Sequence, residues 1–140
     1  MPDILHEVTI EVAPEKVFKA LTEQQALAGW WTTHTVAEPK VGSISEFSFM
    51  GGQFVIKMEV SRLDPAHKVA WMTKQGAPDW SGTRVTWDLA PVDTGTKILF
   101  GHRDFASADG SLPSTSYNWA NYLTSLKDYL EKGKGNPHTY

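Results

Sequence analysis

Residues 117–130, YNWANYLTSLKDYL, are the stretch of this chain that decides its fold. Large apolar side chains recur in it at helical spacing and predict one apolar stripe along a long helix. They are Trp119, Leu123, Leu126 and Leu130. We expect the helix to begin near Pro113 and to run to about Lys132, where Gly133 is suited to end it. A single amphipathic helix must bury its stripe against another layer of the domain.

The layer on which this helix can pack is a run of antiparallel strands that comes before it. Apolar residues alternate with polar ones in each segment, and turn signals such as Gly51-Gly52 and Asp93-Thr94-Gly95 separate the segments. The sequence therefore predicts a sheet of about six strands. The expected strands are Ile4–Val12, Val41–Met50, Gln53–Leu63, a strand through Val69–Thr73, Thr83–Leu89 and Thr96–Asp104.

Two short helices are expected between the first and second strands. Proline suits the first turn of a helix, which favours a helix over Pro14–Thr22. A second helix is expected over about Glu23–Ala28, with Gly29 as its C-terminal cap. Residues 32–40 are predicted to form a loop that leads into the second strand.

The order of these elements predicts an α+β fold, in which a highly curved antiparallel sheet wraps around the long C-terminal helix. A length of 140 residues fits a single domain over residues 1–140. Residues 134–140, which contain Gly135 and Pro137, are expected to be a flexible tail. A helix laid across a curved sheet often leaves a cavity between the two layers, where a small molecule can bind.

The composition excludes several classes of function. The net charge is −3 and the basic residues are scattered, which argues against nucleic-acid binding. The chain has no cysteine, so disulfides and thiolate chemistry are excluded. No apolar run is long enough to span a bilayer, and the first residues lack the pattern of a signal peptide, so we expect a cytoplasmic protein. The oligomeric state cannot be read from the sequence.

Four features of the chain resemble the helix-grip fold of the START-like superfamily, also called SRPBCC. They are the stretch IEVAPEKVFKALT at residues 10–22, the pair Trp30-Trp31, the pair Val41-Gly42 before the second strand, and the closing pattern of residues 119–130. Within the superfamily the chain is most similar to the branch named after the activator of a heat-shock-protein ATPase, the Aha-type family. The resemblance implies a lipid or small-molecule carrier, a polyketide cyclase or a chaperone partner.

Aromatic residues are the main candidates for the walls of the expected cavity. The chain has six tryptophans, and each large aromatic side chain buries about 150–250 Å². These rings either line a pocket or fill the space completely, and both alternatives stay open. Two tyrosines of the final helix offer an apolar ring with a polar tip. The candidate ligand-binding residues are Trp30, Trp31, Phe49, Met58, Trp71, Thr73, Trp87, Phe100, His102, Tyr117 and Tyr122.

His102 is the sharpest candidate for chemistry. It shares the inner face of the last strand with Ile98 and Phe100, and Asp104 has the same phase, so an imidazole–carboxylate pair could form at the cavity mouth. The alternative is an ordinary histidine that is hydrogen-bonded near the strand end. His67 and His138 are expected to be solvated. No histidine spacing suits a metal and no phosphate-binding or nucleophile motif occurs, so we expect no metal and no cofactor. The sequence assigns no catalytic residue, and whether the protein is an enzyme stays open.

Three functions compete at this point. The first is the binding of a small, largely apolar or aromatic ligand in the cavity. The second is a polyketide-cyclase-like enzyme with a pocket His or Tyr, which requires an acid and a base with shifted pKa values inside the cavity. The third is a chaperone-partner or protein-interaction module, which requires an exposed apolar or charged patch on the outer face.

Overall fold

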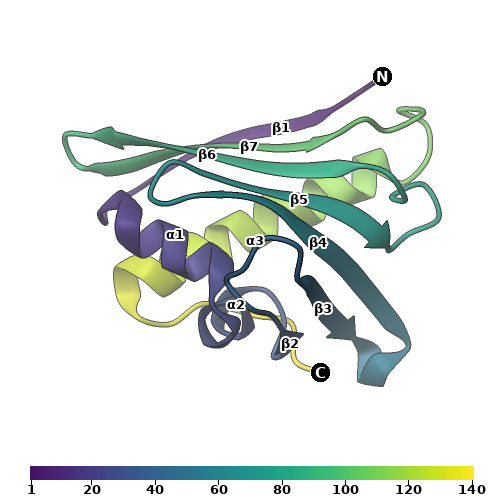
Figure 1. The fold of residues 1–140 in the computed structure, drawn as a ribbon, viewed down its shortest axis with the longest axis horizontal. Coiled ribbons are helices and arrows are strands. Elements are labelled where there is room, and N and C mark those ends of the chain that lie inside the picture. Colours follow the sequence, from purple (N-terminus) through teal and green to yellow (C-terminus); the bar gives the residue numbers. More distant parts are fainter.

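The chain folds as one curved antiparallel sheet with a long helix laid across its concave face (Figure 1). The computed structural model describes residues 1–140. In chain order the elements are β1 (Ile4–Ile10), α1 (Pro14–Thr22), α2 (Gln24–Trp30), β2 (His34–Val36), β3 (Ile44–Phe49), a short 3₁₀ turn η1 (Met50–Gly52), β4 (Phe54–Asp64), β5 (Lys68–Gln75), β6 (Arg84–Val92), β7 (Gly95–Arg103) and α3 (Leu112–Lys132). The predicted helix-grip architecture is confirmed.

The sheet has seven strands in the order β1-β7-β6-β5-β4-β3-β2, and every pairing is antiparallel. The prediction of about six strands missed β2, which lies in the expected loop 32–40. This strand has only three residues, His-Thr-Val, and it carries no apolar alternation that could reveal it. It pairs with β3 at the edge of the sheet, where Thr35 lies opposite Phe47.

No helix has the length and apolar character needed to span a bilayer.

The second helix continues past its expected end. Gly29 was expected to cap it, but α2 runs to Trp30. The glycine serves packing instead, because a Cβ atom at Gly29 would lie 2.5 Å from Cε1 of Tyr129 on α3. Because Gly29 has no Cβ atom, α2 and α3 can approach each other closely. Gly133 does end α3 as predicted, with a left-handed φ of 80°.

Aromatic rings fill most of the space between the sheet and α3. Trp87 of β6 is completely buried and packs edge-to-face against Trp71, with ring centroids 5.6 Å apart, and against Phe100 at 4.7 Å. Trp119 of α3 lies 4.6 Å from Phe100. Trp30 of α2 closes the cluster from below, where its indole N–H donates to the carbonyl of Ala20 at 2.8 Å. The six tryptophans divide between the two alternatives: Trp30, Trp71 and Trp87 lie in a filled core, whereas Trp31, Trp80 and Trp119 also border a cavity.

The C-terminal tail is fastened to the body of the protein, although the sequence predicted a flexible segment for residues 134–140. His138 forms a parallel bridge beside Thr32: its N–H donates to Trp31 O at 2.8 Å, and its carbonyl accepts from Thr33 N at 2.9 Å. Tyr140 stacks on His34 with ring centroids 4.3 Å apart. The tail thus lies against the segment between α2 and β2, and the C-terminus lies beside β2 in Figure 1.

Candidate functional site

A cavity of about 300 Å³ lies at one end of the helix–sheet interface. Its walls come from the first half of α3, the β3–β4 hairpin, the loop between β5 and β6, and the C-terminal tail. Most of the lining is apolar and aromatic, and no charged side chain contributes to it. The lining residues are Trp31, Phe49, Met50, Phe54, Ile56, Ala77, Trp80, Ser111, Ser114, Thr115, Asn118, Trp119, Tyr122 and His138.

The loop between β5 and β6 is tied to the start of α3, and this contact shapes one wall of the cavity. The Trp80 indole N–H donates to Thr115 Oγ1 at 3.2 Å. Asp79 accepts hydrogen bonds from the backbone N–H of Ser111 at 2.9 Å and from its hydroxyl. These bonds hold the pKa of Asp79 below its ordinary value, the Ser111 hydroxyl being the largest cause. Asp79 therefore caps α3 from outside the helix, and it fixes the position of the first turn.

Three polar side chains stand at the mouth of the cavity. Asn118 and Tyr122 come from α3, and His138 comes from the tail. The Tyr122 ring is half-buried, and burial raises the pKa of its phenol. The His138 ring packs on Phe49 with centroids 5.2 Å apart. The cavity thus offers an apolar interior with hydrogen-bonding groups at its edge, an arrangement that is common in small-molecule sites.

Only some of the candidate ligand-binding residues line this cavity. Trp31, Phe49 and Tyr122 do. The buried residues that instead belong to the filled core or to the contacts behind the cavity are Trp30, Met58, Trp71, Thr73, Trp87, Phe100 and His102. Tyr117 was expected to contact a ligand, but 71% of it is exposed, because it lies on the face of α3 that points away from the sheet.

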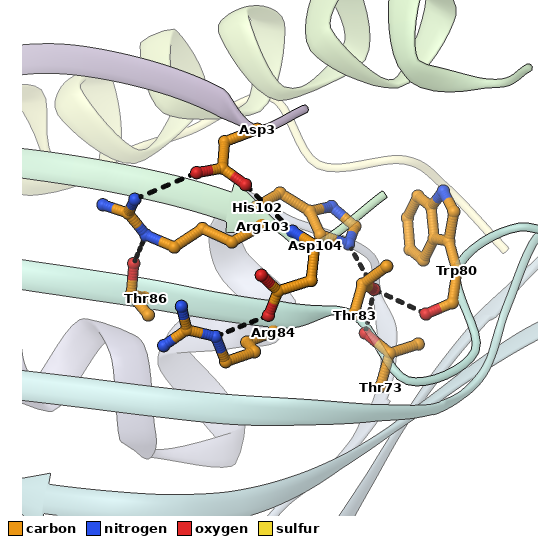
Figure 2. A network of polar contacts seen from close by, with 9 residues as sticks. All are labelled: Asp3, Thr73, Trp80, Thr83, Arg84, Thr86, His102, Arg103 and Asp104. Atoms are coloured by element: carbon orange, nitrogen blue, oxygen red, sulfur yellow. Dashed lines mark hydrogen bonds and ion pairs between the residues drawn. The ribbon is translucent and has the colours of Figure 1, made fainter. Parts of the chain in front are cut away.

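His102 belongs to a buried polar network rather than to the cavity (Figure 2). The Trp119 indole N–H donates to His102 Nδ1 at 3.1 Å, so the proton of the neutral imidazole sits on Nε2 and donates to Thr83 Oγ1 at 2.8 Å. The Thr83 hydroxyl in turn donates to Trp80 O and lies 3.1 Å from Thr73 Oγ1. Burial lowers the pKa of His102 to about 4. The imidazole is therefore a neutral link between α3, β7 and the end of the loop that precedes β6.

The expected pair of His102 and Asp104 does not form. β7 ends at Arg103, and Asp104 has a positive φ of 74°, which turns its side chain out of the strand's alternation. Its carboxylate accepts from Arg84 Nε at 2.7 Å. Figure 2 shows this ion pair beside a second one, in which Arg103 donates to Asp3 at 3.3 Å. These groups lie partly exposed at the strand ends, outside the cavity.

Several lining residues escaped the sequence reasoning. Phe54 and Ile56 share a face with the inner residues of β4, so the alternation of that strand could have identified them. Trp80 lies in a loop with no periodicity, and His138 lies in the tail that was expected to be solvated. Both reach the cavity through contacts between segments that are far apart in the chain.

Comparisons with known proteins agree with this architecture. The model of the family described as Activator of Hsp90 ATPase homolog 1-like protein matches residues 11–131. None of the curated protein sequences matches the chain. Among solved structures, the chain is similar to the Aha1 dimer from Colwellia psychrerythraea, with 34% identity, a TM-score of 0.88, and coverage of 96% of this chain and 100% of that one.

Two further solved structures share the fold at lower identity. Protein SSP2350 from Staphylococcus saprophyticus is 20% identical, with a TM-score of 0.82 and coverage of 99% of this chain and 98% of that one. DynU16, a protein of the dynemicin biosynthetic locus, is 20% identical, with a TM-score of 0.80 and coverage of 95% of this chain and 48% of that one. At this level of identity the likeness concerns the fold alone.

Proposed function

Because the chain belongs to the family of Activator of Hsp90 ATPase homolog 1-like proteins, within the START-like superfamily, we propose that it binds a small, largely apolar molecule in the cavity between the sheet and α3. The observation that carries the proposal is the cavity of about 300 Å³, which stays open beside an otherwise filled aromatic core. We place this activity in the cytoplasm, as the sequence predicts.

The size of the cavity limits the ligand. A volume of 300 Å³ corresponds to about ten water molecules at about 30 Å³ each, which suits one or two fused rings. Such a compound buries about 200 Å² of apolar area, as a large aromatic side chain does. Burial then contributes about 5 kcal/mol before the cost of association is subtracted, so hydrogen bonds at the mouth are needed for tight binding.

The cyclase-like alternative lacks a suitable acid and base. His102, the residue on which it depended, is buried behind the cavity and faces Trp119 and Thr83 rather than open space. The titratable groups that reach the cavity are Tyr122 and His138, and neither has a carboxylate partner among the lining residues. Ligand binding therefore accounts for the geometry with fewer assumptions than catalysis does.

A protein-interaction role is the second candidate, with another copy of this chain as the partner. Val36, Val41 and Ile44 are 48%, 54% and 46% exposed and lie together at the β2–β3 edge. An exposed apolar patch of this kind often marks an interface, and the similar Colwellia protein is described as a dimer. If this edge is the interface, the variant Ile44→Lys sediments as a monomer where the parent chain sediments as a dimer; a monomeric parent removes this candidate. A chaperone partner, which the family description suggests, stays a prediction.

The ligand-binding proposal can be tested with 2-naphthol, a two-ring probe of suitable size. In ¹H–¹⁵N spectra the indole N–H signals of Trp31, Trp80 and Trp119 should shift most, because these rings line the cavity. Ala77→Phe narrows the cavity and should weaken binding at least tenfold. Ala90→Phe adds the same ring to an exposed position of β6 and serves as the matched control. Equal shifts at all indoles, or equal affinities of the two variants, contradict the proposal.

A further inference from the structure

A second cavity, which we call the tail cleft, lies beside the first one. It has a volume of about 410 Å³ and lies between the outer side of α3 and the C-terminal tail. Its lining is almost entirely polar, in contrast to that of the apolar cavity. The lining residues are Asn118, Asn121, Tyr122, Thr124, Ser125, Asp128, Asn136, Pro137 and His138.

The two cavities meet at the same three side chains. Asn118, Tyr122 and His138 line both the apolar cavity and the tail cleft. No side chain within the protein hydrogen-bonds their amide, hydroxyl or imidazole groups. A molecule that extends past them therefore moves from an aromatic wall to a surface of amides and hydroxyls. The docked tail creates this arrangement, because Asn136 and His138 are held in place by hydrogen bonds to Ser125 and Trp31.

The chemistry of the tail cleft selects the kind of polar group that it can hold. Carboxamides and hydroxyls both donate and accept hydrogen bonds, which suits a partner with several hydroxyl groups. No arginine or lysine lines the cleft, and its one charged residue is Asp128. Asp128 is paired with Lys132 at 3.4 Å on the surface of α3. An anionic group would thus find no cation in the cleft and would face a carboxylate, whereas a neutral hydroxylated group meets suitable partners throughout.

We propose that the ligand of this protein is amphipathic, with one or two aromatic rings in the apolar cavity and a neutral, polyhydroxylated group in the tail cleft. This inference rests on the proposed function and adds the second half of the site to it. The volume of the cleft corresponds to about fourteen water molecules at about 30 Å³ each, which leaves room for a single sugar ring. The chemical class is therefore that of a small aromatic glycoside or an aromatic compound with an equivalent hydroxylated chain.

The test compares three probes that share one ring system: 2-naphthol, 2-naphthyl β-D-glucopyranoside and 2-naphthyl sulfate, each titrated by calorimetry against the whole chain. The glucoside should bind at least tenfold more tightly than 2-naphthol, since it adds several hydrogen bonds at the cleft. The sulfate should bind no more tightly than 2-naphthol. Asn121→Ala, which changes a residue that lines only the cleft, should lower the affinity for the glucoside and leave that for 2-naphthol unchanged.

The control variant is Tyr117→Ala, which alters an exposed side chain of the same helix outside both cavities and should change neither affinity. Equal affinities for 2-naphthol and the glucoside overturn the inference and leave the proposed function intact. Tighter binding of the sulfate than of the glucoside overturns the assignment of a neutral group. If neither 2-naphthol nor the glucoside binds, both the inference and the proposed function fail.

Discussion

The neutral state of His102 should make the stability of this protein fall in weakly acidic solution. Burial lowers the pKa of His102 from its ordinary value of 6.5 to about 4, and the nearby Asp79 carboxylate opposes this shift in part. Between these values the unfolded chain binds a proton that the folded chain does not bind. The contribution of neutral His102 to the free energy of unfolding is therefore fully present well above pH 6.5, and it is lost as the pH falls toward 4. The loss contributed by His102 is about 2 kcal/mol at pH 5 and about 3 kcal/mol at pH 4.

Urea unfolding of the parent chain and of the variant His102→Gln between pH 7 and pH 5 measures the contribution of His102 to the free energy of unfolding. The glutamine amide can still accept from Trp119 and donate to Thr83, but it does not titrate. All other titratable groups are common to both proteins, so the difference between their pH profiles isolates His102. We expect the free energy of unfolding of the parent to fall by about 2 kcal/mol more than that of the variant. Parallel profiles would refute the reasoning, whatever the variant's stability at pH 7.

Three further predictions follow from local geometry. A Cβ at Gly95 would clash with the Ile10 carbonyl oxygen, so Gly95→Ala should lower the free energy of unfolding by about 2–4 kcal/mol in thermal or urea unfolding. The control Gly133→Ala, which has open space around it, should cost about 1 kcal/mol, and equal costs of the two variants would contradict this prediction. Asp79→Ala removes the cap of α3 and should lower stability by about 1–2 kcal/mol; an unchanged midpoint would argue against the cap. Deletion of residues 134–140 should speed hydrogen exchange of the Thr33 amide at least tenfold, because that amide donates to the His138 carbonyl. An unchanged exchange rate would show that the tail does not protect this amide.

The sequence predicts most of the fold because each long element carries its own periodic signal. The stripe of α3 and the alternation of β4 to β7 arise from residues that face one core, and the structure confirms them. The missed features depend on contacts that have no local signal. β2 is held by pairing with β3, and Gly29 lies inside α2 because Tyr129, one hundred positions later, packs against it.

The candidate site was harder to predict for a related reason. Alternation identifies which side chains point inward, but it cannot tell which inward positions are filled by their neighbours. Trp71, Trp87 and Phe100 point inward as expected, but neighbouring side chains bury them in the core and they do not line the cavity. The open space depends instead on Trp80 and His138, which a loop and the tail bring to the end of the sheet.

Trp119 connects the two properties that distinguish this interior, the filled core and the open cavity. Its ring forms part of the cavity wall, and its indole N–H donates a hydrogen bond to His102 Nδ1. Protonation of His102 turns Nδ1 into a donor, so the bond to Trp119 must break and the ring loses the contact that fixes it. A ligand that packs on this ring favours the arrangement in which His102 is neutral. Because Trp119 joins the cavity wall to the buried imidazole, we expect the affinity for the proposed ligand to fall as His102 becomes protonated.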